Sequence, residues 1–216
     1  MEKAQQKLEL ITKYFSDFTP AQLQQLAALE GLYSDWNSKI NVISRKDFDS
    51  LYEKHVLHSL AIATAFEFAA GSTIVDLGTG GGFPGIPLAI FFPEVRFHLV
   101  DSIGKKIKVV NAVAEALELK NVTTAHSRIE DVKDKKFDFV VSRAVAPLKD
   151  LWKWSKPLLK KPAPNSTNQK PGLICLKGGD LSTEIAESGC RPRVMEVFEI
   201  FGEEYFKDKY LLYVPV

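Results

Sequence analysis

Hydrophobic and polar positions follow two different periods along the chain. In residues 1–70, apolar side chains recur at the spacing of amphipathic helices in two segments. The first helix is expected to begin with Thr19 as its N-cap and Pro20 in its first turn, and the second with Asp47 or Asp49 as its cap. Because amphipathic helices bury one face, this part of the chain predicts an N-terminal helical cap on the remainder.

From residue 72 onward, short apolar runs alternate with helical stretches, a pattern typical of a parallel sheet with right-handed crossovers. We therefore expect residues 71–216 to form an α/β, Rossmann-like domain around a mostly parallel seven-stranded sheet, its last two strands antiparallel at the edge. The segment 160–172, rich in Pro, Asn and Lys, predicts an exposed loop. The strands are expected at 73–77, 96–101, 122–126, 137–143, 172–178, 194–201 and 209–216.

Composition narrows the class of protein. With 216 residues, 45% of them hydrophobic and 25% charged, the chain suits one α/β domain with a small appendage. No apolar run reaches the ~18 residues of a membrane span, so we expect a cytoplasmic protein without membrane contact. We also expect a monomer. The two cysteines, Cys175 and Cys190, lack CxxC spacing and argue against a disulfide framework or a zinc site.

Charge leaves the partner open. The net charge of +1 is not typical of a nucleic-acid-binding protein. However, residues 143–193 carry 10 basic residues against 4 acidic ones. That excess is compatible with a polyanionic partner and equally with a solvated surface.

A glycine-rich turn is the main candidate for chemistry. The sequence "VDLGTGGGFPGI" (75–86) connects an expected strand to an expected helix. In a parallel sheet such a turn lies at the carboxyl edge of the strands, where ligands bind. Glycine tolerates positive φ and lets a ligand approach the main chain. Gly78, Gly80 and Gly82, with Phe83 beside them, therefore predict a binding loop.

Two ligand classes use such loops. The segment "GGGFPG" matches the dinucleotide pattern GxGxxG, which alone is a weak signal. Asp76, two residues before Gly78, completes D-x-G-x-G-x-G, which is typical of S-adenosylmethionine-dependent methyltransferases. Its carboxylate suits a ligand with an ammonium group and would repel a pyrophosphate. Asp101, about 20 residues past the loop, could hold a ribose in either ligand. S-adenosylmethionine is thus the favoured cofactor and a nicotinamide nucleotide the alternative.

Seven segments of the chain have a combination of residues typical of one protein family. Seven segments resemble, in order, blocks of the glucose-inhibited division protein B family, the bacterial 16S rRNA guanine-N7 methyltransferases. The resemblance implies a class I methyltransferase fold and methyl transfer to guanine N7 of small-subunit (16S) rRNA, within a ribosomal particle. The segments are "WNSKINVIS" (36–44), "HVLHSL" (55–60), "VDLGTGGGFPGIPLAI" (75–90), "DSIGKKIKVV" (101–110), "HSRIED" (126–131), "VVSRAVAPL" (140–148) and "LKGG" (176–179).

The resemblance also implies roles for single residues. Gly78 and Phe83 would line the methionine and ribose side of the cofactor, and Asp101 would hold the ribose. Ile129 and Glu130 would flank the adenine. Arg143, at the end of the fourth expected strand, would face the transferred methyl group.

The residues agree with this chemistry. Guanine N7 carries a lone pair and no hydrogen, so its methylation needs no general base. The fourth strand accordingly ends in Ser142 and Arg143 rather than in the acid or amide typical of exocyclic-amine methylation. A guanidinium stays protonated, so Arg143 is expected to position rather than to transfer protons. His55 and His58 have no third ligand nearby in the sequence, and we expect no metal.

The RNA substrate requires an accessible base and phosphate contacts. In A-form RNA the major groove is too deep for side chains, so the target guanine is expected in a loop or unstacked. The candidate phosphate-binding residues are Arg45, Lys105, Lys106, Arg128 and Lys177.

Two other functions stay open: a dinucleotide-dependent oxidoreductase, and a ribosome-binding module with a vestigial cofactor site.

Overall fold

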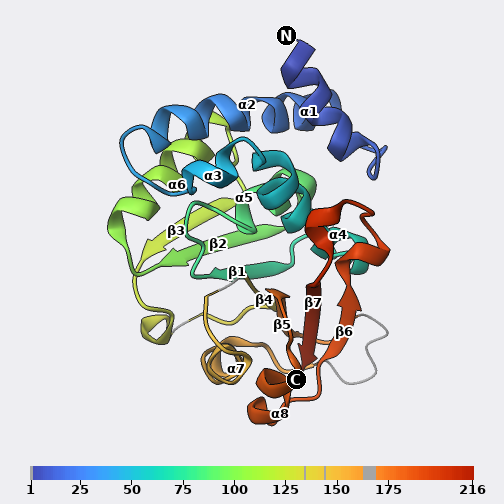
Figure 1. Ribbon diagram of the computed structural model, residues 1–216. Helices are drawn as coiled ribbons and strands as arrows, with labels where there is room; N and C mark the ends of the chain where they lie inside the picture. Colours follow the sequence, from blue (N-terminus) through green and yellow to red (C-terminus); the bar gives the residue numbers. More distant parts are fainter. Residues whose placement is uncertain (1, 134, 144, 163–168) are drawn as a thin grey trace.

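A mixed sheet of seven strands separates two layers of helices in the computed structural model of the chain (Figure 1). The structure describes residues 2–133, 135–143, 145–162 and 169–216, without the side chains of residues 2–6 and of Arg45. The strand order is β3-β2-β1-β4-β5-β7-β6, and β7 runs antiparallel to both of its neighbours. The predicted fold class is confirmed. The strands are β1 (Thr73–Leu77), β2 (Arg96–Asp101), β3 (Val122–His126), β4 (Phe139–Arg143), β5 (Gly172–Gly178), β6 (Arg193–Glu196) and β7 (Lys209–Pro215).

Most expected strands keep their predicted bounds, and β6 is the main difference. It ends at Glu196, and a short 3-10 helix, η4 (Val197–Glu199), follows where the sequence predicted a longer strand. Val197 and Phe201 are fully buried, so the chain turns inward there instead of continuing along the edge. Of the expected exposed loop 160–172, residues 163–168 lie outside the described part of the chain.

The helices form two layers (Figure 1). One layer packs on the face of the sheet that carries Ile74, Phe97 and Leu99, the other on the face that carries Val75 and Val100. The first layer comprises α1 (Glu2–Thr12), α2 (Pro20–Asn37), α3 (Arg45–Phe48), the π-helix η1 (Tyr52–Leu57), α4 (His58–Ala65), α5 (Gly85–Phe91) and α6 (Gly104–Ala116). The second comprises α7 (Leu148–Ser155), η3 (Lys156–Leu158) and α8 (Ser182–Ser188), and two further 3-10 turns are η2 (Ile129–Asp131) and η5 (Glu204–Phe206).

The start of α2 follows the prediction, whereas the next helical segment does not. The Thr19 hydroxyl accepts a hydrogen bond from the Gln22 amide in a capping box, with Pro20 in the first turn. In the second segment Ser44, not Asp47 or Asp49, caps α3. The chain then widens into the π-helix η1 before α4 begins, so the expectation of one continuous α-helix was wrong.

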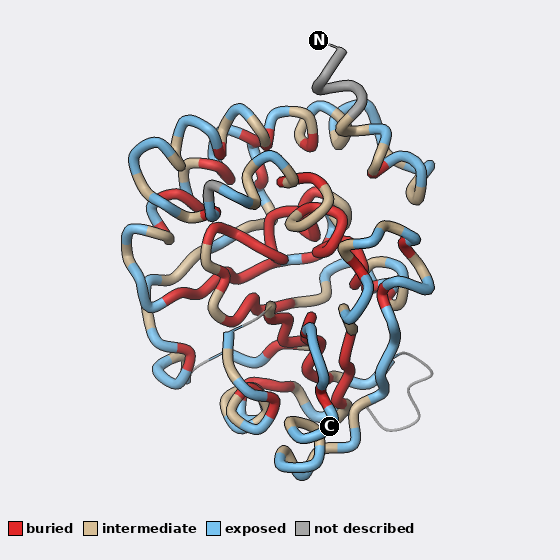
Figure 2. Tube along the Cα trace, in the orientation of Figure 1, coloured by how far each residue is buried: buried red, intermediate tan, exposed pale blue. Residues whose placement is uncertain are grey.

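The N-terminal helices share one apolar core with the sheet. Leu26 and Leu29 of α2 belong to the same buried cluster as Phe97 and Leu99 of β2. Figure 2 shows buried residues concentrated in the inner strands β1, β2, β4, β5 and β7 and in the helix residues packed against them, whereas the edge strands β3 and β6 have none. The boundary at residue 70 therefore stays a prediction. None of the described helices is both long and apolar enough to cross a membrane.

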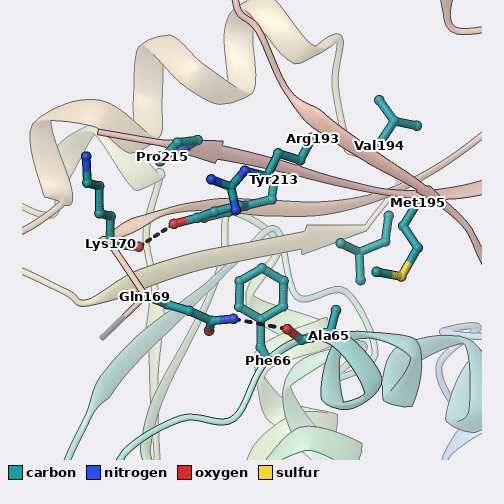
Figure 3. Close-up of a pocket in the computed structure, with 10 residues that line it drawn as sticks. Ala65, Phe66, Gln169, Lys170, Arg193, Val194, Met195, Tyr213 and Pro215 are labelled. Carbon is teal, nitrogen blue, oxygen red and sulfur yellow. Dashed lines mark hydrogen bonds between the residues drawn. The ribbon is translucent and has the colours of Figure 1, made fainter. Parts of the chain in front are cut away.

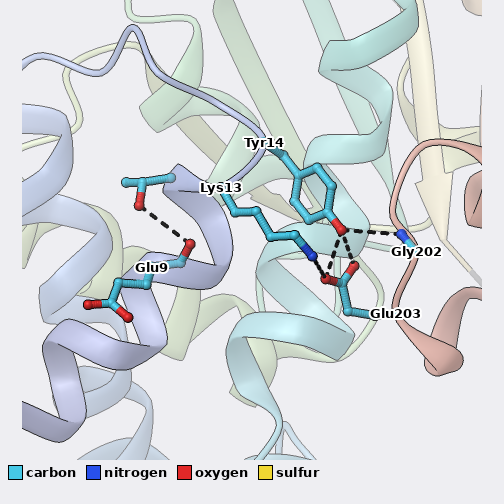
Figure 4. A network of polar contacts seen from close by, with 6 residues as sticks. Glu9, Lys13, Tyr14, Gly202 and Glu203 are labelled. Atoms are coloured by element: carbon cyan, nitrogen blue, oxygen red, sulfur yellow. Dashed lines mark hydrogen bonds and ion pairs between the residues drawn. The ribbon is translucent and has the colours of Figure 1, made fainter.

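Polar contacts attach the N-terminal helix to the C-terminal part of the chain (Figure 4). The Lys13 ammonium lies 2.9 Å from a Glu203 carboxylate oxygen, and the Tyr14 hydroxyl donates to the same carboxylate at 2.8 Å. The backbone amide of Gly202 donates to the Tyr14 hydroxyl. These contacts help to hold α1 on the layer that also contains α4 and α5.

Candidate cofactor site

The glycine-rich turn between β1 and α5 has the backbone that only glycine adopts easily. Gly78 and Gly80 have φ of +68° and +58°. A Cβ atom at Gly78 would lie 2.6 Å from Cγ2 of Val145, which belongs to the loop after β4. A Cβ atom at Gly80 would meet nothing within 4 Å. The turn is thus constrained by the neighbouring loop at Gly78 and open at Gly80.

Asp76 supports this turn from within the protein. Its Oδ2 accepts hydrogen bonds from the Thr79 hydroxyl at 2.6 Å and from the Gly85 amide at 2.9 Å. Its Oδ1 is buried and has no hydrogen-bond partner among the described residues. Burial raises the pKa of Asp76 to about 7, although both hydrogen bonds and the charge of Arg143 oppose the rise. One oxygen therefore fixes the loop, and the other has no partner inside the protein; Asp76 is fully buried and does not itself line the cavity described below.

Asp101 connects the glycine turn to the start of α6. At the end of β2, its Oδ2 accepts from the Gly80 amide and its Oδ1 from the Ile103 amide, each at 2.8 Å. The two bonds fix the orientation of the carboxylate. Each oxygen keeps a second lone pair that can accept from a hydroxyl group.

Several predicted residues line one cavity of about 300 Å³. The ends of β1 and β2, the segment 127–130 after β3 and the loop after β4 form its walls. Val145 and Trp154 were not predicted, because an isolated valine and a tryptophan in an amphipathic helix usually indicate a core. Val145 is nevertheless 41% exposed. The lining residues are Leu77, Gly78, Val100, Asp101, Ser102, Ser127, Arg128, Ile129, Glu130, Val145 and Trp154.

Arg143 lies at the end of β4 and turns toward the N-terminal helices. Its Nη1 donates to the Lys54 carbonyl at 3.0 Å, and its Nη2 lies 2.8 Å from Nδ1 of His55. The guanidinium carbon is 5.2 Å from the centre of the Phe83 ring. Arg143 is not among the residues that line the cavity, but its charge lowers the pKa of Asp76 and so acts at this edge of the sheet.

Phe83 also faces the N-terminal helices. It is 3% exposed, and its ring centre lies 5.0 Å from that of Tyr33 and 5.1 Å from that of His55. It does not line the cavity beside Gly78. The resemblance places Phe83 with Gly78 against the cofactor, whereas in the structure only Gly78 lines the cavity.

The N-terminal part of the chain makes direct contacts with the glycine turn. The Tyr33 hydroxyl donates to the Gly81 carbonyl at 2.6 Å, and Val42 lies against the same glycine. Sequence reasoning considered His55 only as half of a metal pair with His58, and missed its contact with Arg143. Among the described residues, no group of three or more His, Cys, Asp or Glu could hold a metal ion.

The predicted phosphate-binding residues differ in their exposure and in whether their charge is already paired. Arg128 is exposed and lines the cavity, whereas the exposed Lys105 and the half-buried Lys106 do not line it. Lys177 requires a correction: it is 9% exposed, its ammonium lies 2.6 Å from a Glu184 carboxylate oxygen, and it also donates to the Ala146 carbonyl. Its charge is therefore balanced inside the protein. The side chain of Arg45 lies outside the described part of the structure.

A second hollow of about 460 Å³ lies between α4 and the β6–β7 edge (Figure 3). Phe66, Arg193 and Tyr213 line it together with Gln169 and Lys170. The Tyr213 hydroxyl donates to the Lys170 carbonyl and the Gln169 amide to the Ala65 carbonyl, so these polar groups serve the fold. No residue predicted for the site lines this hollow.

Comparisons with known proteins identify the family of this chain. The sequence model of the GidB family, described as rRNA small subunit methyltransferase G, matches residues 22–200. The chain is 56% identical to ribosomal RNA small subunit methyltransferase G of Bacteroides fragilis, over 97% of the chain and 100% of that protein. It is 54% identical to the protein of the same name from Flavobacterium psychrophilum, over 97% of the chain and 98% of that protein.

Solved structures support the fold alone. A SAM-dependent methyltransferase from Aquifex aeolicus superposes with a TM-score of 0.55 at 17% identity, covering 80% of the chain and 98% of that structure. Aeropyrum pernix fibrillarin, solved with natively bound S-adenosyl-L-methionine, gives a TM-score of 0.53 at 11% identity, covering 73% of each chain.

Proposed function

The chain belongs to the family of rRNA small subunit methyltransferase G, and on this premise we propose that it transfers a methyl group from S-adenosylmethionine to N7 of a guanine in small-subunit rRNA. The observation that supports this most directly is the unpartnered Oδ1 of the buried Asp76 on β1, whose next two residues, Leu77 and Gly78, line a cavity at the carboxyl edge of the sheet. The protein is a methyltransferase with the predicted Rossmann-like fold.

The described residues fit S-adenosylmethionine. The free oxygen of Asp76 can accept a hydrogen bond from the methionine ammonium, and Asp101 can accept from the ribose hydroxyls. Ile129 and Glu130, which line the same cavity, would flank the adenine. A pyrophosphate would bring negative charge beside both carboxylates, so this arrangement does not favour the oxidoreductase alternative.

The site is suited to a reaction without a general base. The bound cofactor supplies a methyl group on a positively charged sulfur, and guanine N7 has no proton to lose. Ser142 is fully buried and donates to the Leu77 carbonyl. Cys175 is also fully buried, and burial raises its pKa to about 12, so it is a poor nucleophile. The protein would therefore act by aligning the two reactants and by excluding water.

Arg143 suits a positioning role in this reaction. Burial lowers its pKa, but guanidinium groups in proteins stay protonated. Its fork is held by Lys54 and His55 and carries further N–H groups that can contact the cofactor carboxylate or the target nucleotide. We retain it as the candidate catalytic residue in this sense.

The RNA would approach over the rim of the cavity. Arg128, which lines the cavity, and Lys105 and Lys106 in the first turn of α6 would supply positive charge, in keeping with phosphate contacts that position a substrate without reading its sequence. The guanine would have to be unstacked or in a loop to reach the site.

We further propose that the substrate is a ribosomal particle and that the enzyme acts as a cytoplasmic monomer.

The proposal can be tested by mapping the methyl group. Small subunits from cells that lack the protein would be incubated with purified enzyme and isotopically labelled S-adenosylmethionine, and the rRNA digested for mass spectrometry. We expect one 7-methylguanosine per subunit. Binding of cofactor and particle without transfer would instead support the ribosome-binding module, and a methyl group on an exocyclic amine would contradict the base-free chemistry.

A further inference from the structure

The side chain of Arg143 is held by two groups of the N-terminal helical layer. Nη1 donates to the Lys54 carbonyl at 3.0 Å and Nη2 lies 2.8 Å from the His55 imidazole. The Phe83 ring lies under the guanidinium at 5.2 Å and under His55 at 5.1 Å. These contacts restrain a long and otherwise flexible side chain in both its direction and its plane.

The backbone around His55 is unusual. Lys54 and His55 lie in η1, a π-helix that spans Tyr52–Leu57, and the amide of His58 bonds to the carbonyl five residues earlier, at Glu53. π-helices are rare and often occur at functional sites. The wider turn presents a backbone carbonyl and an adjacent imidazole nitrogen to the same guanidinium.

The protonation of His55 follows from this contact. A guanidinium has only donors, so Nδ1 of His55 must carry the lone pair and the ring must be neutral. Burial, together with the charge of Arg143 and the smaller effect of Lys54, lowers the pKa of His55 to about 3, while Asp47 opposes the change. His55 is therefore a hydrogen-bond acceptor throughout the physiological pH range.

From this geometry we propose that His55 is a positioning residue for Arg143. With the Lys54 carbonyl, its Nδ1 fixes the guanidinium plane at the end of β4, so that the free N–H groups of the fork keep one orientation toward the reactants. The inference rests on the proposed function, since it gives Arg143 its role. It also explains why η1 belongs to the site although it does not line the cavity.

The test compares two substitutions of similar size. His55→Gln can place an amide oxygen near the position of Nδ1, whereas His55→Met cannot accept comparably from Arg143. Tyr52→Phe is the matched control, because Tyr52 lies in the same π-helix but its hydroxyl donates to the Leu26 carbonyl of α2, whereas the partners of Arg143 are Lys54 and His55. The measurements are S-adenosylmethionine affinity by calorimetry, single-turnover methyl transfer and urea unfolding.

We expect His55→Met to reduce single-turnover transfer or cofactor affinity by about tenfold or more, as expected for a lost hydrogen bond to a charged group. His55→Gln should recover most of that loss, and Tyr52→Phe should lower stability without changing either rate or affinity. In a protein that already carries Arg143→Gln, His55→Met should reduce transfer or cofactor affinity by less than about a further threefold, because the effect of His55 depends on Arg143.

Several results would overturn the inference. His55→Met within about threefold of the wild type, equal behaviour of the Met and Gln variants, or independent effects of His55→Met and Arg143→Gln would each show that His55 only packs the helix. If His55→Met does not fold, His55→Ala, which also removes the acceptor, replaces it in both Arg143 backgrounds, and the same limits on coupling apply. Failure of the wild type to methylate guanine N7 would overturn the proposed function alone, because the calorimetric cycle measures the coupling without transfer.

Discussion

Asp76 should make both stability and cofactor binding depend on pH. Burial raises its pKa to about 7, whereas in the unfolded chain the value is near the ordinary 3.8. Between these values the folded protein holds a proton that the unfolded chain has released, so this group's contribution to stability falls as pH rises from about 4 to about 7. A difference of about 3 pH units at about 1.4 kcal/mol per unit corresponds to about 4 kcal/mol.

Asp76→Asn tests this directly. The Asn carbonyl oxygen can still accept from Thr79 and Gly85, while the amide nitrogen takes the place of the unpartnered oxygen. The variant has no group to ionise, so its stability relative to wild type should rise by about 3 kcal/mol between pH 5 and pH 8. Urea unfolding of the cofactor-free proteins at both pH values measures the difference. Because both proteins share the buried histidines, their titration cancels in the comparison.

A matched control lies at the other end of the sheet. The pKa of Asp138 is lowered: burial opposes the shift, but hydrogen bonds from Lys160 and Thr73 outweigh it. Asp138 therefore stabilises the fold above pH 4 and loses this effect only in more acid solution, so the cost of Asp138→Asn should be constant between pH 5 and pH 8. A difference between wild type and Asp76→Asn that varied by less than about 0.5 kcal/mol across that range would refute the reasoning about Asp76.

The same carboxyl predicts proton release on binding. The ammonium of S-adenosylmethionine favours the ionised form of Asp76, so affinity should increase up to about pH 7 and level off above it. Calorimetry in two buffers of different ionisation enthalpy would detect the released proton. Asp76→Asn should bind more weakly and without this pH dependence.

Three further substitutions and one pH profile test the site. Gly80→Val should abolish cofactor binding at a strain cost of about 1–2 kcal/mol, because its φ is +58° and its side chain would enter open space; unchanged affinity by calorimetry would contradict the loop assignment. Asp101→Ala should weaken binding by about 2–3 kcal/mol, and an effect under about 0.5 kcal/mol would mean that Asp101 does not hold the ribose. Arg143→Lys should reduce single-turnover transfer strongly, because one ammonium cannot span the Lys54 carbonyl and His55 in a planar fork. At saturating cofactor the wild-type rate should be flat from about pH 6 to about pH 9, and a basic limb abolished by one carboxylate or histidine substitution would reopen exocyclic-amine chemistry.

The sequence predicts the strands of the central sheet well because their apolar runs are short and bounded by turns. β1, β2, β3 and β5 have the expected bounds, and their carboxyl ends bring Gly78, Asp101 and Ile129 to one cavity. The topology of the sheet brings these residues close together, since parallel strands place their carboxyl ends at one edge. That part of the site was predictable without side-chain detail.

Side-chain direction was not predictable in the same way. Lys177 has the residue type and the strand-end position of a phosphate-binding lysine, yet it binds Glu184 of α8. That pairing depends on how α8 packs, which no local pattern in β5 reveals. Phe83 likewise lies in a binding loop but packs against Tyr33, which is 50 positions earlier in the chain.

The π-helix is a segment where sequence periodicity predicted a helix but tertiary contacts accompany a different helix geometry. Its sequence has ordinary helical spacing, so periodicity predicted a regular helix at 47–66. In the structure this segment meets the half-buried Arg143, whose guanidinium needs acceptors, and the widened turn supplies the Lys54 carbonyl and His55 Nδ1. Removing a charged group from water without such partners would be costly, so the contacts from the π-helix help to stabilise the arginine at the end of β4. The N-terminal helices therefore contribute to the candidate site: without residues 1–70 the glycine turn would lose the Tyr33 contact at Gly81, and Arg143 would lose the groups that orient it.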